Sequence, residues 1–224
     1  PLRHRLLSAD QVAELQGKCG GVLSSDYNDI KNWCDGNLSA SLPLSSDETY
    51  EYHITAMSFM WQMSGNSAYA ARAKTLVQSA MGRGFEGQRT YTRMLAICLD
   101  WCYSYLTSSE RATIGNELVQ TTDAYKASLS WDVMNNFHTK LTRIKEFAYA
   151  GLALHGAGVN NSKAIEYCNF FREHTYGSQH ALACVDEIAA DGSYYEGDYN
   201  IISLYAGFRS CLWLRYVETD ENPF

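Results

Sequence analysis

The segment Gln88-Arg-Thr-Tyr-Thr-Arg-Met-Leu-Ala-Ile-Cys-Leu-Asp-Trp-Cys-Tyr-Ser-Tyr-Leu106 decides the fold class of this chain. Its apolar and aromatic residues recur every three or four positions, which is the spacing of one face of an amphipathic helix. Thr107 and Glu110 follow at the spacing of a capping box, so a second helix begins there and runs to about Leu129. Because helices joined by a short turn lie antiparallel, this stretch predicts a helical hairpin.

The same spacing recurs on both sides of this hairpin, and only three prolines interrupt the chain. Cap residues and glycines bound the segments, among them Asn66 before one helix and Gly65 after another. Further helices are predicted over about 8–20, 26–34, 47–63, 67–81, 137–155, 161–174, 178–190 and 198–217. The sequence therefore predicts an all-α chain.

Consecutive helical hairpins are typical of two architectures, the α/α toroid and the α-solenoid. A solenoid shows a fixed repeat length with recurring residues, whereas helix lengths vary here and no motif recurs. A closed toroid needs more helices than this chain supplies. We therefore expect an incomplete α/α toroid built of antiparallel helix hairpins.

Composition limits the possible functions. With 224 residues, 46% hydrophobic and 19% charged, residues 1–224 form one globular helical domain. The formal net charge is −7 and the Lys and Arg residues are scattered, which argues against a nucleic-acid partner. No run approaches the ~18 apolar residues of a membrane span. The chain begins at Pro1 without a leader, so we expect a removed signal or a piece of a longer protein, with a secreted or periplasmic location.

The seven cysteines form no C-x-x-C pair and have no histidine at zinc-finger spacing, so the sequence predicts neither a metal site nor a cofactor. Cys98 and Cys102 lie four apart in an apolar helix and are expected to be buried thiols. Spacing leaves open whether Cys19 and Cys34 form a disulfide. Asp100 and Trp101 are assigned to packing, with Asp100 buried and hydrogen-bonded.

Two short segments carry groups suited to chemistry on a sugar. Asp191 to Tyr199, Asp-Gly-Ser-Tyr-Tyr-Glu-Gly-Asp-Tyr, gathers tyrosines and carboxylates around two glycines between predicted helices. The other segment is Asn135-Asn136-Phe137-His138. Together they indicate a carbohydrate cleft in which a tyrosine moves a proton while an amide and an imidazole stabilise the resulting negative charge.

Four segments give the chain a specific resemblance. The opening His4-Arg5-Leu6-Leu7-Ser8, the stretch from Ala96 to Tyr103, the Asn-Asn-Phe-His segment and the turn from Asp191 to Gly197 resemble parts of the heparinase II/III and alginate lyase-like polysaccharide lyases. The resemblance implies that the chain is the N-terminal helical part of a longer lyase with a C-terminal β-sandwich domain. It also implies β-elimination on an acidic, uronic-acid-containing polysaccharide.

Carried over by position, the resemblance assigns catalytic roles to three residues. Asn136 and His138 would neutralise the substrate carboxylate, with Asn135 as the alternative amide and His138 also a candidate base. Tyr199 would be the proton donor. The substrate-binding residues would be Asn135, Tyr194, Tyr195, Glu196 and Lys145. His138 lies on the flank of its predicted helix with Thr142 and Lys145, where a partly exposed structural histidine is the alternative.

Two other functions remain open on the sequence. Asp191 and Glu196 are carboxylates of the kind that glycoside hydrolases use in pairs. The chain is alternatively a carbohydrate-binding or assembly module of the same fold that carries out no chemistry. The products formed from uronic-acid polymers distinguish the three functions.

Overall fold

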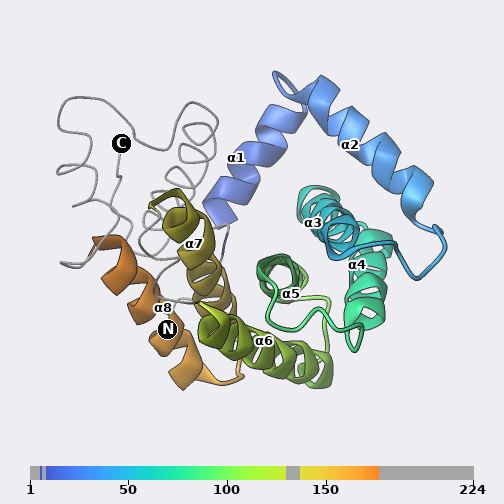
Figure 1. Cartoon of the computed structure of the whole chain (residues 1–224). Helices are drawn as coiled ribbons and strands as arrows, with labels where there is room; N and C mark the ends of the chain where they lie inside the picture. Colours follow the sequence, from blue (N-terminus) through green and yellow to red (C-terminus); the bar gives the residue numbers. More distant parts are fainter. Residues whose placement is uncertain (1–5, 7–8, 130–136, 177–224) are drawn as a thin grey trace.

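The structure is a computed structural model that describes residue 6 and residues 9–129 and 137–176. The described residues form helices and turns without any strand, which confirms the prediction of an all-α chain for this part (Figure 1). The helices are α1 Ala9–Cys19, α2 Ser24–Asn37, α3 Asp47–Ser64, α4 Ser67–Ala80, α5 Arg89–Trp101, α6 Ser108–Ser128, α7 Phe137–Leu154 and α8 Asn161–Tyr176. The predicted helices over 178–190 and 198–217 lie outside the described residues.

The helices form an inner and an outer row. Helices α3, α5 and α7 pack against one another in order, while α4 packs on α3, α6 on α5 and α8 on α7. Helices α1 and α2 extend the arrangement along α3. Figure 1 shows α2, α4, α6 and α8 along the outside of a curved path, with α1, α3, α5 and α7 on its inner side.

The helix boundaries follow the local signals in the sequence. Ser46 caps α3 by accepting the Thr49 backbone N–H, and Gly65 closes that helix with a φ of 67°, a left-handed conformation that glycine adopts without strain. The predicted Asn66 cap accepts the backbone N–H of Ala68 at 3.0 Å. The predicted Thr107–Glu110 capping box is also confirmed.

Helix α2 is longer at both ends than the predicted 26–34, and the end of α5 also differs from the prediction. The pattern predicted a helix reaching Leu106, whereas α5 ends at Trp101 and tight turns follow, with the Leu106 N–H donating to the carbonyl of Cys102 at 3.0 Å. Cys102 and Leu106 remain buried in the core after the helix has ended. Apolar spacing reports which residues are buried rather than which carbonyl each N–H meets, so the pattern runs past the helix end.

Helix α5 crosses the centre of the core, and ten of its residues are buried. Asp100 is 2% exposed and accepts the Leu6 backbone N–H at 2.8 Å, which confirms that this carboxylate is buried and hydrogen-bonded. The bond fixes the fully buried Leu6 against α5. Cys98 and Cys102 are buried thiols as predicted, and Cys19 and Cys34 are separate thiols. No helix in the described part of the chain is long and apolar enough to cross a membrane.

The capping box of α6 predicts a defined loss of stability. Thr107→Ala removes the hydroxyl that accepts the Glu110 N–H at 3.2 Å, and we expect the free energy of unfolding in urea to fall by about 1 kcal/mol. Ser109→Ala, in the first turn of the same helix, is the control and should change it by much less. Equal losses in both variants would contradict the cap assignment.

Gly151 of α7 allows close approach of α8, because a Cβ at this position would lie 2.5 Å from the Cys168 Sγ and 3.0 Å from the Ala164 carbonyl oxygen. We expect Gly151→Ala to lower the free energy of unfolding by on the order of 1–3 kcal/mol through overpacking. Gly36→Ala in α2 is the matched control, since nothing lies within 4 Å of its Cβ. That substitution should stabilise the chain by about 0.5–1 kcal/mol, so a loss there would contradict the argument.

Candidate functional site

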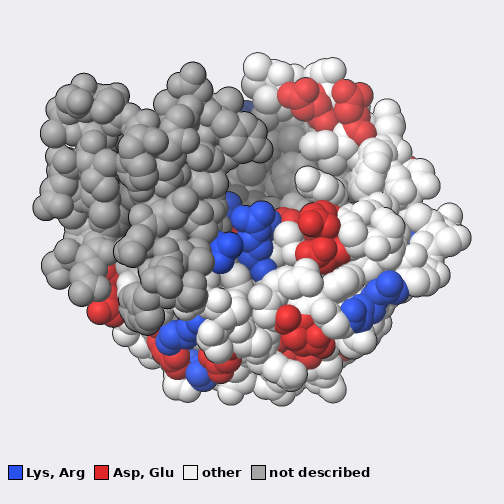
Figure 2. Space-filling view, in the orientation of Figure 1, with Lys and Arg blue, Asp and Glu red and all other residues white. Residues whose placement is uncertain are grey.

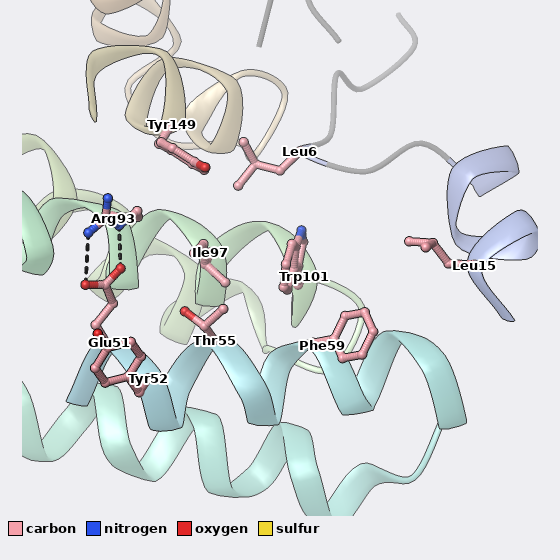
Figure 3. A pocket seen from close by; sticks show the side chains of 10 residues that line it. All are labelled: Leu6, Leu15, Glu51, Tyr52, Thr55, Phe59, Arg93, Ile97, Trp101 and Tyr149. Atoms are coloured by element: carbon pink, nitrogen blue, oxygen red, sulfur yellow. Dashed lines mark hydrogen bonds and ion pairs between the residues drawn. The ribbon is translucent and has the colours of Figure 1, made fainter. Parts of the chain in front are cut away.

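A cavity of about 600 Å³ lies between the N-terminal segment, α1 and the three inner helices. Its walls are mainly apolar and aromatic, with one acidic and one basic side chain among the described lining residues (Figure 3). The lining residues are Leu6, Leu15, Glu51, Tyr52, Thr55, Phe59, Arg93, Ile97, Trp101 and Tyr149. A mostly apolar cavity with a few convergent polar groups is typical of a small-molecule or sugar site.

Helical spacing explains why these residues converge. Arg93, Ile97 and Trp101 lie four apart on α5 and form one stripe along the cavity wall. On α3 the stripe consists of Glu51, Thr55 and Phe59, also four apart. Because α3 and α5 pack side by side, the two stripes form adjacent walls.

A charged network joins the three inner helices beside the cavity. Arg93 of α5 donates from Nε and Nη2 to the two carboxylate oxygens of Glu51 of α3, at 2.5 and 2.9 Å. Its Nη1 donates to the Oε1 of Glu146 of α7 at 3.1 Å. Figure 3 shows the paired contact between Arg93 and Glu51 at one end of the cavity. Each guanidinium nitrogen therefore has a carboxylate partner.

Glu146 is the buried member of this network. Its side chain is fully buried, and its Oε2 has no hydrogen-bond partner among the described residues. Burial raises the pKa of Glu146 to about 7; the charge of Glu51 acts in the same direction, while Arg93 and Lys145 act in the opposite direction. A pKa near 7 predicts that Glu146 changes its protonation state near neutral pH.

Uncharged polar groups and aromatic rings complete the cavity. The Thr55 hydroxyl and the Trp101 indole N–H are buried and have no hydrogen-bond partner within the described part of the chain, which is energetically unfavourable. Tyr52 is 70% exposed, so a large aromatic ring stands at the rim. Phe59 and Trp101 pack together with their ring centroids 6.5 Å apart.

A second cavity of about 490 Å³ is lined by residues at the N-terminal ends of α3 and α5 and by residues of α6 and α7. Its described lining residues are Asp47, Glu48, Gly87, Gln88, Arg89, Thr90, Tyr125, Ser128 and Arg143. Asp47 accepts a hydrogen bond from the Thr90 hydroxyl. No ion pair joins Arg89 or Arg143 to a carboxylate in the described ranges. Figure 2 shows the molecule in the orientation of Figure 1, with a hollow near the centre of the view. Basic and acidic residues lie next to each other at its edge.

Most of the site residues predicted from the sequence lie outside the described residues, namely Asn135, Asn136, Tyr194, Tyr195, Glu196 and Tyr199, and so do Asp191 and the side chain of His138. Position 138 belongs to the first turn of α7. Lys145 is described and partly buried, and its charge acts on Glu146. By helical register, position 138 falls within about 20° of both Lys145 and Tyr149, so one face of α7 carries all three positions.

Sequence reasoning missed the network of Glu51, Arg93 and Glu146. A signal was present, because Arg93 and Glu146 each interrupt a strongly apolar helical stretch, and buried charges of this kind are paired or functional. The partners were not readable, since 42 positions separate Glu51 from Arg93 and 53 separate Arg93 from Glu146.

No group of three His, Cys, Asp or Glu side chains within the described ranges is arranged to hold a metal ion.

No protein-family model and no curated protein matches the chain.

The buried Glu146 predicts how stability depends on pH. Its folded pKa, about 7, exceeds the ordinary value of 4.5, so the folded state holds a proton that the unfolded state has released. The stability from this group is complete below pH 4.5 and is lost as pH rises to about 7, by up to about 3 kcal/mol. Glu146→Gln keeps the shape without the titration, so its urea stability should vary less over this range.

Glu173→Gln is the control for this measurement, because Glu173 is an exposed carboxylate on α8. It should keep the pH slope of the unsubstituted chain. An unchanged slope in Glu146→Gln would show that Glu146 does not retain its proton in the folded state.

Proposed function

We propose that this chain is the helical part of a polysaccharide lyase that cleaves a uronic-acid-containing polysaccharide by β-elimination. In this proposal the two rows of helices belong to an incomplete α/α toroid of antiparallel hairpins, and a C-terminal β-sandwich domain completes the parent protein. The alternation of inner helices α3, α5 and α7 with outer helices α4, α6 and α8 supports that architecture.

One observation carries the functional proposal. The face of α7 that holds position 138 also holds Tyr149, three helical turns further on, and Tyr149 lines the aromatic cavity. A residue assigned to catalysis from sequence thus shares a helix face with the wall of a cavity large enough for a sugar ring. Lys145 lies on the same face of α7, seven positions after position 138, and Arg89 and Arg143 line the second cavity.

The reaction assigns one step to each group. Asn136, or Asn135, and His138 hydrogen-bond the uronate carboxylate, which makes the neighbouring C5 proton more acidic. His138 accepts that proton, and the electron pair of the C5–H bond forms the C4=C5 double bond as the C4–O4 bond breaks. Tyr199 donates its phenolic proton to O4 of the leaving sugar. Tyr194, Tyr195 and Glu196 hold the adjacent part of the chain.

A specific observation also favours the binding-module alternative. The charged side chains in the described wall of the aromatic cavity, Arg93 and Glu51, are paired with each other. Such a wall binds a ligand without supplying an acid or a base.

A hydrolase using Asp191 and Glu196 would instead form new reducing ends without a double bond.

The proposal predicts an unsaturated product. Incubation of the chain with uronic-acid polymers should produce the ultraviolet absorbance of a C4=C5 double bond, and His138→Ala and Tyr199→Phe should each lower the rate by on the order of 10²–10⁴. Tyr27→Phe on α2, away from both cavities, is the matched control. New reducing ends without the absorbance would indicate a hydrolase, and binding with neither product would indicate a binding module.

A further inference from the structure

Helix α2 is less deeply buried than the inner helices. Cys34 is its buried residue, and Figure 1 shows α2 at the edge of the molecule, outside α3 and α4. The Tyr69 hydroxyl of α4 donates to the Asp35 carboxylate of α2 at 2.5 Å. Trp33 of α2 packs against His53 of α3 with the ring centroids 4.6 Å apart and an interplanar angle of 62°. A helix with so little buried surface opens more readily than one in the core.

His53 lies beneath this contact as a buried imidazole. The residue is 8% exposed, and its Nδ1 is buried without a hydrogen-bond partner among the described residues. Burial lowers the pKa of His53, and the positive charge of Arg72 on α4 lowers it in addition. The folded chain therefore holds this imidazole in its neutral form at neutral pH.

Arg72 is the group whose charge acts on His53. Its Nη2 donates to the carbonyl of Ala40 at 2.6 Å, and its Nε is buried without a hydrogen-bond partner in the described part of the chain. An imidazolium at position 53 would thus lose its hydration beside a second cation, which is energetically unfavourable.

Carboxylates on the neighbouring helices do not relieve this repulsion. Helices α1, α2, α4 and α5 pack against α3, and the carboxylates nearest to the contact in sequence are engaged by other groups. The engaged groups are Asp35 with Lys31 and Tyr69, Glu51 with Arg93, and Glu14 with Lys18. Glu51 also lies two positions before His53 on α3, which places the two side chains about 200° apart around the helix.

We propose that His53 is an acid-sensitive latch for α2: protonation of its imidazole breaks the contact with Trp33 and releases α2 from α3, while the inner helices keep their fold. Release lets water hydrate the imidazolium and exposes Cys34. After release the imidazole titrates near its ordinary pKa of 6.5, whereas in the closed chain its pKa is lower. The contact is therefore complete above pH 6.5 and is weakened as pH falls below that value. The latch is independent of the lyase proposal, which uses none of these residues.

Thiol labelling of the 224-residue chain measures the release, because Cys34 is fully buried while α2 is in place. The chain is pulsed with dithiodipyridine at about pH 7.5 and about pH 5, on either side of the ordinary histidine pKa. Mass spectrometry of the peptides identifies each labelled cysteine, and each rate is divided by that of the unfolded chain at the same pH.

We expect the relative labelling rate of Cys34 to rise at least about threefold at the lower pH. The rate of the fully buried Cys98 of α5 should not rise, because Glu146 makes the whole fold more stable at lower pH. An equal or lower rate at Cys34 would overturn the inference. An equal rise at Cys98 would also overturn it, since the whole chain would then be unfolding.

Variants assign the effect to His53. His53→Gln keeps a polar side chain that takes no proton and should abolish the rise at Cys34, and Arg72→Gln, which removes the repelling charge, should reduce it. His174→Gln is the matched control, because His174 is 6% exposed and packs against Phe170 on α8 with the ring centroids 4.2 Å apart. It should keep the full rise.

A full rise in His53→Gln would overturn the latch. If that variant does not fold, the other two still decide, because equal rises in Arg72→Gln and His174→Gln would overturn it as well.

Discussion

Arg93 of α5 donates hydrogen bonds to carboxylates on α3 and α7, so one guanidinium connects the three inner helices. Glu51 meets it in a bidentate contact from α3, and Glu146 meets it from α7. Buried ion pairs contribute little net stability, because desolvation offsets most of the attraction. Removing one partner, however, leaves a buried charge without compensation, so alternative registers of α3, α5 and α7 are strongly disfavoured. We infer that the main effect of the network is to select one register of α3, α5 and α7 relative to one another, rather than to add net stability.

The aromatic cavity follows from this arrangement. Once the network fixes the rotation of the helices, the four-residue stripes on α3 and α5 form its walls, and Tyr149 of α7 completes them. The Asp100 carboxylate adds a second constraint by holding Leu6 against α5, which places the N-terminal segment in the wall. Each constraint includes a buried carboxylate, Glu146 on α7 and Asp100 on α5, and each of these accepts a hydrogen bond from a defined donor.

The sequence predicted the helices of the described part of the chain, and it did not indicate the charged network at Arg93. Caps at Asn66 and Thr107 and the left-handed Gly65 are local signals, because each depends on residues within a few positions of one another. The network at Arg93 depends on residues more than forty positions apart, and no local pattern indicates which carboxylate an arginine will meet. Arg93 and Glu146 were detectable as charges within apolar helices but not as a pair.

By itself, the sequence determined that the described part of the chain is helical, which caps start several of its helices, and that Asp100 is buried. Hydrophobic period, cap chemistry and the placement of a carboxylate in an apolar helix are local properties. Only the tertiary structure decided that Glu51, Arg93 and Glu146 meet, that aromatic residues from three helices line one cavity, and that Arg89 and Arg143 lie beside another. The physical reason is that pairing and cavity shape depend on how helices pack, and the packing angles and registers are set jointly by side chains distant in the sequence.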